Sequence, residues 1–200
     1  MSDGTPPRWA ERLLEWLLDS EDRQTVPGDL LEEYRLHVLP ARGEAAADAW
    51  YIRQVAGFQL RATWPWALAF SAAYIARVVM DCLAPPADFH ARAAVSTTIA
   101  IALLLGVGSR ASWRTGSVAG GTLAAATTAV LASIVSVASV GVMLSIRHDP
   151  STLDALARSG GVDEAFALPV LLVVPATIIG VLGGVAAAGA RWLAARLSPR

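Results

Sequence analysis

Four long apolar stretches dominate the chain, and all of them follow a charged first third. They cover residues 66–84, 92–109, 118–146 and 165–190. A helix needs about 20 apolar residues to cross the ~30 Å hydrocarbon core of a bilayer, and each stretch meets or approaches that length. Amides in lipid must bond within their own segment, so each stretch is predicted to be a helix. The pattern predicts an all-α integral membrane protein with a four-helix transmembrane bundle.

The first third, residues 1–63, shows apolar positions at helical spacing among many charges, which predicts three short helices. The first helix is expected to begin at Pro6-Pro7, where proline is tolerated. We therefore expect a small three-helix head, residues 1–63, ahead of a four-span domain, residues 64–200. The apolar face of the first helix is predicted to carry Trp9, Leu13, Trp16 and Leu17.

Turn residues delimit the other two helices of the head. Asp29 is expected to cap the second helix after the Pro27-Gly28 break, and Pro40 is expected to end it. The third helix is predicted to begin near Gly43 and to continue toward the first apolar stretch. The apolar positions of these two helices are Leu30, Leu31, Tyr34, Val38, Ala47, Trp50, Tyr51, Val55 and Phe58.

Arginine placement predicts the orientation. The 16 basic residues are all arginine, and positive residues of short loops stay on the cytoplasmic side. Twelve arginines lie in residues 1–63, between the second and third stretches, or after the fourth, whereas the opposite side holds Arg92, Arg147 and Arg158. We expect a multi-pass protein of the bacterial inner membrane with both termini cytoplasmic. Tryptophans suited to the headgroup layer lie on that same side: Trp64, Trp66, Trp113 and Trp192.

Composition narrows the function classes. The chain is 54% hydrophobic and its mean hydropathy is +0.48, which is unusual for a soluble domain. Residues 1–63 hold seven arginines against eleven acids, a net charge of −4, so nucleic acid is not an expected partner. The first 20 residues lack an apolar segment followed by a cleavage site, so no cleavable signal peptide is expected. The single cysteine, Cys82, excludes an internal disulfide.

The aromatic and acidic side chains of the head permit two interpretations. They form the core of a small helical bundle, or part of the set forms a groove for a partner. The candidate partner-binding residues are Trp9, Trp16, Asp29, Glu33, Tyr34, Trp50 and Tyr51.

The order of motifs over residues 6–55 is specific. It consists of Pro6-Pro7-Arg8, a leucine-rich helix, Glu21-Asp22-Arg23, Gly28-Asp29-Leu30, Glu32-Glu33-Tyr34, Trp50-Tyr51 and Arg53-Gln54-Val55. This segment resembles the permease prefix domain, which precedes many macrolide-export-type ABC transporter permeases.

The resemblance implies a prefix domain joined to a compact membrane body. Such permeases carry a large extracytoplasmic domain after the first span, whereas the first outer loop here has about eight residues. The implied partner is an ABC-type permease or its regulator. The prefix carries no established catalytic residues, so the resemblance transfers none to this chain.

Arg77 and Asp81 are the most distinctive pair inside an apolar stretch. They are four residues apart, so they share a helix face and can form an ion pair. Ionisable residues within a span mark functional sites by default. Both also lie in the outer half of the span, where a structural pair at the interface is the favoured explanation. A polar pathway and a structural pair therefore both remain open.

Small residues recur at close-packing intervals in the third and fourth stretches. Tight packing within one chain, homo-oligomer or hetero-oligomer formation, and a hydroxyl-lined conduit are all compatible with this pattern. Pro175 is expected to kink the fourth span. The candidate packing residues are Gly121, Ala125, Ser133, Gly180 and Gly184, with hydroxyls at Thr122, Thr127, Thr128, Ser136 and Ser139.

Motifs for catalysis are missing from the sequence. It contains no H-E-x-x-H, no G-x-S-x-G and no glycine-rich phosphate loop. A metal site made by His90, His148, Asp88 and Asp149 lacks a spacing motif. We therefore expect no cofactor and no enzyme activity, and a non-catalytic accessory or regulatory protein that docks through its head. The alternative is a small transporter or channel that uses Arg77, Asp81 and the hydroxyls of the third span.

Overall fold

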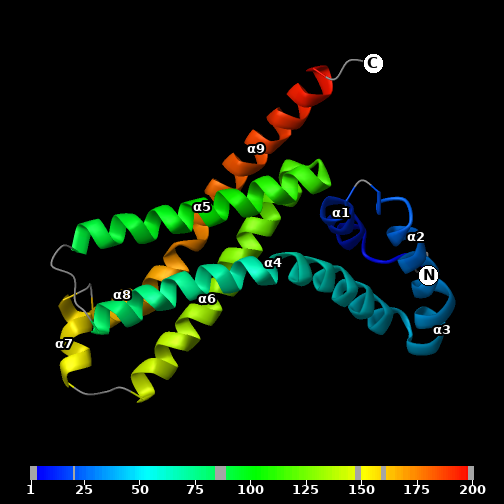
Figure 1. Ribbon diagram of the computed structural model, residues 1–200. Coiled ribbons are helices and arrows are strands. Elements are labelled where there is room, and N and C mark those ends of the chain that lie inside the picture. Colours follow the sequence, from blue (N-terminus) through cyan, green and yellow to red (C-terminus); the bar gives the residue numbers. More distant parts are fainter. Residues whose placement is uncertain (1–3, 20, 84–88, 147–149, 159–160, 198–200) are drawn as a thin grey trace.

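The computed structural model describes residues 4–19, 21–83, 89–146, 150–158 and 161–197, and no strand occurs within those ranges. The all-α prediction is confirmed for them. The helices, shown in Figure 1, are α1 (Arg8–Leu17), α2 (Val26–Glu33), the π-helix η1 (Tyr34–Val38), α3 (Leu39–Arg42), α4 (Glu44–Leu83), α5 (Phe89–Thr115), α6 (Val118–Ile146), α7 (Pro150–Arg158), α8 (Gly161–Leu171) and α9 (Val173–Leu197).

Four helical segments are long and apolar enough to cross a membrane, as the apolar stretches predict: α4, α5, α6 and the α8–α9 pair. Helix α6 has the predicted bounds, 118–146. Helix α5 is longer than the predicted 92–109, because Ser109–Thr115 continue the helix as a polar extension. Gly116 ends it with φ +63°, a conformation that costs glycine little.

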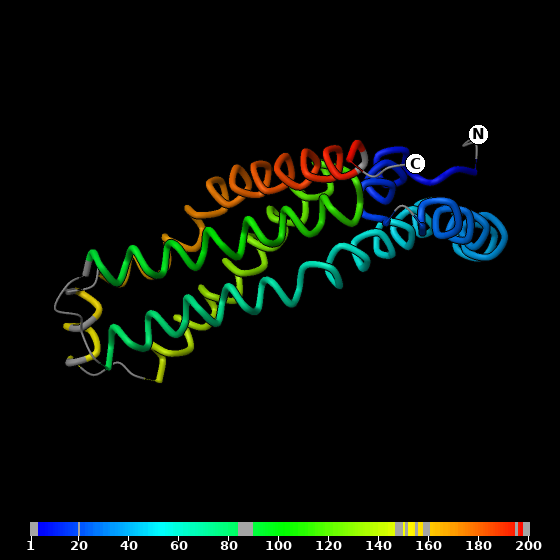
Figure 2. The backbone as a smooth tube through the Cα atoms, turned by 45° about the horizontal axis from the view of Figure 1, so that its top comes forward, coloured from blue at the N-terminus to red at the C-terminus, as the bar shows by residue number. Residues whose placement is uncertain are grey.

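Helix α6 is the centre of the bundle and contacts α4, α5, α8 and α9. Helices α4 and α5 contact each other much less than either contacts α6. The first three helices lie at the end of the bundle where α5 turns into α6, and α7 lies at the opposite end (Figure 1). Both chain termini are therefore at the same end, as Figure 2 shows.

Helix α4 joins the head to the bundle without a break. Its 40 residues would extend ~60 Å as a straight helix. It bends near its middle (Figures 1 and 2), where Pro65 lacks the N–H that a helix interior needs. One buried stripe follows its whole length, so the same face packs first in the head and then in the bundle. That stripe consists of Ala47, Tyr51, Val55, Gln59, Thr63, Ala67, Phe70, Ser71, Tyr74, Val78 and Asp81.

The helices at the start of the chain share a core, and α1 presents only part of its predicted face to it: Leu13 and Leu17 pack against the core, but the two tryptophans do not. The buried positions of α1 are Ala10 and Leu14, followed by Leu18, whereas Trp9 and Trp16 are 57% and 44% exposed. The small side chain of Ala10 lets α1 approach α4 closely, and the two indoles lie outside this contact. The core comprises Ala10, Leu14, Leu18, Tyr34, Val38, Ala47, Tyr51 and Val55.

The predicted start and end of the second head helix are wrong. Helix α2 begins at Val26, and Thr25 rather than Asp29 is its N-cap residue. Pro27 occupies the first turn, where the missing N–H is not needed, so proline starts the helix instead of breaking the chain. Pro40 likewise lies in the first turn of α3 after the π-helical turn, and the helical path ends at Gly43 with φ +75°.

The fourth span is divided, as expected for an internal proline. Helix α8 ends at Leu171 and α9 begins at Val173. Pro175 cannot donate to the carbonyl of Leu171, and its ring crowds that carbonyl, so the helix breaks one turn before the proline. The short helix α7 lies between α6 and α8 in the chain.

Glycines bring α9 into direct contact with α6 and α5. A side chain on Gly180 would overlap Ala125 of α6. A side chain on Gly121 would overlap Ser112 of α5, and one on Gly184 would begin 2.8 Å from the hydroxyl of the same serine. Four of the predicted packing residues therefore lie at contacts within one chain, where small residues permit helices to approach closely.

The head docks on the turn between α5 and α6. Arg114 forms a forked ion pair with Asp19, with atoms 2.7 Å and 3.2 Å apart. Arg23 donates to the last carbonyl of α5. The carbonyl of Trp16 lies so close to Gly120 that a side chain there would overlap it. Polar and steric contacts thus position α1 against the bundle.

Candidate functional site

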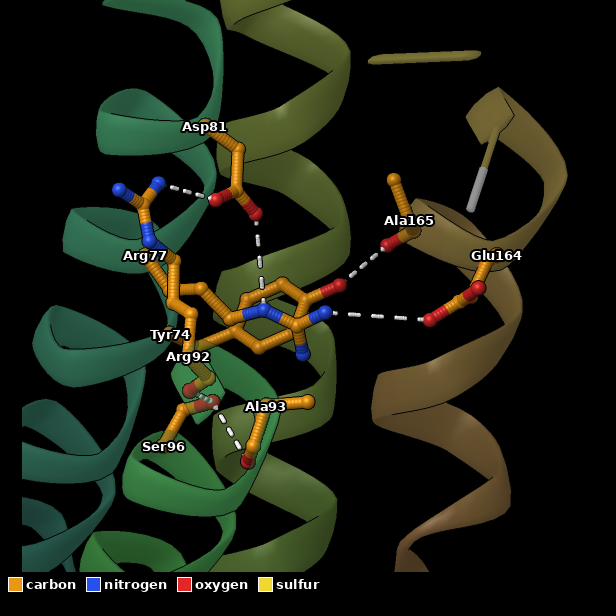
Figure 3. A network of polar contacts seen from close by, with 8 residues as sticks. All are labelled: Tyr74, Arg77, Asp81, Arg92, Ala93, Ser96, Glu164 and Ala165. Carbon is orange, nitrogen blue, oxygen red and sulfur yellow. Dashed lines mark hydrogen bonds and ion pairs between the residues drawn. The ribbon is translucent and has the colours of Figure 1, made fainter. Parts of the chain in front are cut away.

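A charged cluster joins the end of α4 to the starts of α5 and α8 (Figure 3). These helix ends lie near α7, at the end of the bundle opposite the head (Figure 1). Arg77 and Asp81 form the predicted pair, with Nε and Oδ2 3.6 Å apart. Arg92 of α5 is closer, with Nη1 2.6 Å from the other carboxylate oxygen of Asp81. Glu164 of α8 lies 3.9 Å from Arg77. Among the described residues, the cluster therefore joins three helices through two cations and two anions.

Packing of α4 determines where this cluster forms. Tyr74, Val78 and Asp81 share the buried stripe of α4, and the Tyr74 hydroxyl donates to the carbonyl of Ala165 at 2.8 Å. This bond holds the start of α8 against α4 and brings Glu164 to Arg77. The Asp81 side chain is only 4% exposed. A carboxylate so buried needs strong partners, which the two guanidinium groups provide.

Sequence reasoning identified half of this cluster. Arg92 was expected in the outer loop, but α5 begins three residues before it and places it on a helix. Glu164 is not among the residues singled out from the sequence, and it joins the cluster through Arg77. The sequence does carry a signal for the pairing of Asp81 with Arg92. Asp81 precedes the short connection between two predicted helices and Arg92 follows it, and antiparallel helices joined in this way have neighbouring ends.

An apolar cavity of about 240 Å³ lies beside the charged cluster, between α4, α5 and the α8–α9 segment. Its walls include Phe70, Ala73, Leu104, Leu168, Ala176 and Ile179. Arg77 and Ser96 line it as well, and Arg77 brings the cavity next to the ion pairs. We name this space the α4–α5 cavity.

A polar seam runs between α4 and α6. The side-chain amide of Gln59 donates to the carbonyl of Leu123 at 3.1 Å and to the hydroxyl of Thr127 at 2.8 Å. Farther along, the hydroxyl of Ser71 donates to the carbonyl of Ala132 at 3.2 Å. These bonds join the two helices at two depths of the bundle.

Three buried polar atoms have no hydrogen-bond partner within the described residues: Oε1 of Gln59, Oγ1 of Thr128 and Oγ of Ser136. Thr128 and Ser136 flank Ala132 at four-residue spacing, so they share the α6 face that contacts α4. Ser133, a predicted packing residue, is also buried. The hydroxyls of Thr122 and Ser139 bond instead to carbonyls of their own helix.

The aromatic residues of the head divide into buried and exposed sets. Tyr34 and Tyr51 are buried and meet edge to face, with ring centroids 6.0 Å apart. The Tyr34 hydroxyl donates to Asp48 at 2.6 Å. The pKa of Tyr34 is raised to about 12, mainly because the phenol is buried and also because it donates this hydrogen bond. Trp9 and Trp16 are exposed on α1.

The other candidate partner residues lie apart from these tryptophans. Asp29 and Glu33 are exposed on α2, and Trp50 is half-buried on α4. Glu33 lies 3.1 Å from the ring of His37 one turn later. Of the seven candidate residues, Tyr34 and Tyr51 are therefore buried, and the other five are exposed or half-buried.

Metal-ligating side chains do not cluster in the described part of the chain, where no group of three His, Cys, Asp or Glu residues could hold an ion. His90 is exposed at the start of α5. Asp88, His148 and Asp149, the other members of the proposed metal site, lie outside the described residues. Cys82 is half-buried and packs near the end of α4.

No protein-family model, curated protein or solved structure matches this chain. The resemblance to the permease prefix domain stays a prediction from the motifs.

Proposed function

We propose that the protein is a non-catalytic protein of the bacterial inner membrane whose head docks a partner, an ABC-type permease or its regulator. The four long apolar helices support insertion in a membrane. The head, the α5–α6 turn and the end of α9 share one end of the bundle, and most arginines lie there. That end is cytoplasmic in this proposal, and the charged cluster faces the outside.

The exposure of Trp9 and Trp16 is the observation that carries the docking role. The head fills its core with Tyr34, Tyr51 and aliphatic side chains, so neither tryptophan is needed there. Both lie on α1, seven residues apart and therefore on one side of the helix. Tryptophan is enriched among the residues that dominate the energy of protein interfaces. We therefore place the docking surface on this side of α1.

Affinity purification of the full-length chain from native membranes tests this proposal. Wild type is expected to recover an ABC permease or its regulator, and Trp9→Ala/Trp16→Ala is expected to lose it. Leu36→Ala is the matched control, because Leu36 is 61% exposed on η1 and not on α1. Recovery of no permease or regulator, or equal recovery by the tryptophan variant, would contradict the docking role.

The unpartnered atoms of the α4–α6 seam favour a second function, a small transporter or channel. Buried polar groups normally have partners, and Gln59, Thr128 and Ser136 each keep one atom without any in the described structure. Asp81 lies beyond the seam toward the outer end of α4. A flux assay in liposomes would separate transport from the docking role. A transporter or channel is expected to give flux with wild type, and Asp81→Asn or Gln59→Leu is expected to abolish that flux. Equal background flux in all three proteins would exclude it.

A further inference from the structure

We propose that the α4–α5 cavity binds one acyl chain of a phospholipid, with the phosphate beside Arg77 and Arg92. This inference rests on the membrane insertion in the proposed function and is independent of the docking partner. In the proposed orientation the cavity lies in the outer leaflet, because it adjoins the charged cluster at the end opposite the head.

The chemistry of the cavity walls fits hydrocarbon. Phe70, Leu104, Leu168 and Ile179 are apolar. Ala73, Ala100 and Ala176 add only small side chains to the walls, which leaves the space open. An apolar cavity of roughly 150 Å³ stays free of water and accommodates benzene. The cavity here, about 240 Å³, has room for a longer hydrocarbon segment. An empty space of that size would deprive its lining of dispersion contacts.

The cavity is accessible from the side of the bundle. Ile99 and Ile101 line it from α5 and are 45% and 39% exposed. Helices α4 and α5 contact each other sparsely, and none of the residues that line the cavity belongs to α6. A lipid-facing opening admits an acyl chain laterally from the leaflet. Such a chain needs no aqueous route.

The polar end of the cavity matches a headgroup. Arg77 lines the cavity and shares Asp81 with Arg92, which places two guanidinium groups at this end. Asp81 and Glu164 also lie at this end and pair with these groups, so a phosphate there would share guanidinium donors with the carboxylates. Guanidinium groups suit phosphate because their planar donors match its oxygens. Phe70 lies seven residues before Arg77, so the apolar wall extends roughly 10 Å along α4 from the charged end. The order of apolar wall and cation matches the order of acyl chain and phosphate in a phospholipid.

Lipid retention by the full-length protein in mild detergent tests the inference. Native mass spectrometry of wild type is expected to show about one phospholipid per chain, the stoichiometry of a single site. Ala100→Phe fills the cavity and is expected to lower occupancy about tenfold. Ile134→Phe is the matched control, since Ile134 is exposed on α6 and does not line the cavity. It should retain lipid like wild type.

Photocrosslinking of wild type provides a readout that does not depend on a variant folding. The chain is reconstituted in phosphatidylethanolamine–phosphatidylglycerol vesicles that carry a phospholipid with a diazirine on one acyl chain. The yield of adducts is expected to be higher on cavity residues such as Ile99 and Ala73 than on the lipid-facing Ile134. Uniform labelling, retention of a fatty acid or detergent alone, or equal retention by Ala100→Phe would overturn the inference. A chain that fails to insert in the vesicles would instead contradict the proposed function.

Discussion

At the scale of single residues, the buried carboxylate of Asp81 depends most on partners of opposite charge. Its carboxylate is buried between α4, α5 and α8, where an unpaired charge is very unfavourable. Arg92, 2.6 Å away, is its closest partner, and Arg77 is 1 Å farther from the carboxylate. The pairing of Arg77 with Asp81 alone, which the sequence suggests, therefore understates the role of Arg92.

Replacing Asp81 with asparagine is expected to lower the free energy of unfolding by about 3 kcal/mol, because two half-buried guanidinium groups lose their shared anion. Thermal unfolding in detergent micelles measures the change. Glu164→Gln is the control and should cost less than about 1 kcal/mol, since that pair is long and exposed. In the double variant Asp81→Asn/Arg92→Gln the loss should be smaller than the sum of the single losses. Additive losses would show that the two groups do not interact.

Tyr34 makes the head sensitive to high pH. Its pKa is about 12 in the folded chain, above the ~10 of an unfolded tyrosine, so folding favours the neutral phenol. The stabilisation is fully present below pH ~10 and is lost as the pH rises toward 12. Tyrosinate absorbance, compared between wild type and Tyr34→Phe, should assign a transition near pH 12 to this residue. A Tyr34 transition near pH ~10 would contradict its burial.

At the scale of elements, α4 and the glycine contacts define the architecture. One face of α4 is buried from Ala47 to Asp81, so the helix contributes to both the head core and the bundle core. Helices α5, α6 and α9 pack through small residues that permit their backbones to approach. The sequence indicates this packing by its glycine spacing, but it does not identify which helix each glycine meets.

Gly180→Val is expected to destabilise the bundle by about 2–3 kcal/mol, because the added side chain overlaps Ala125 of α6. Gly189→Ala is the matched control on the same helix, since nothing lies within 4 Å of that position. The free energy of unfolding of the control is expected to rise by up to about 1 kcal/mol, because alanine has a higher helix propensity than glycine. Unfolding in micelles measures both. Equal stability of the two variants would refute the close contact between α6 and α9.

At the scale of the whole molecule, the head and the bundle are held together by the continuous helix α4 and by the docking of α1 on the α5–α6 turn. The ion pair between Asp19 and Arg114 is substantially exposed and contributes little energy. Close contact between the Trp16 carbonyl and Gly120 therefore constrains the docked position more than the charges do.

Gly120→Val is expected to displace α1 from the bundle while α4 and the bundle stay folded. Hydrogen exchange should rise in α1 and at the α5–α6 turn, and not in the centre of α6. Gly57→Val is the control on α4, where no atom lies within 4 Å. Unchanged exchange in α1 would show that the head does not depend on this contact.

Sequence alone specified the four long apolar helices, the bounds of α6, the turn at Gly43 and the pairing of Arg77 with Asp81. These features depend on local composition and on residues a few positions apart, for which helical periodicity is sufficient. The rest depends on distances between segments remote in the chain. Only the tertiary structure decided that Trp9 and Trp16 are exposed while Tyr34 and Tyr51 are buried, because the packed face of α1 depends on which side chains it meets. It also decided that Arg92 pairs with Asp81 and Glu164 with Arg77, and that small residues leave a cavity beside them, since these features result from how α4, α5 and α8 come together.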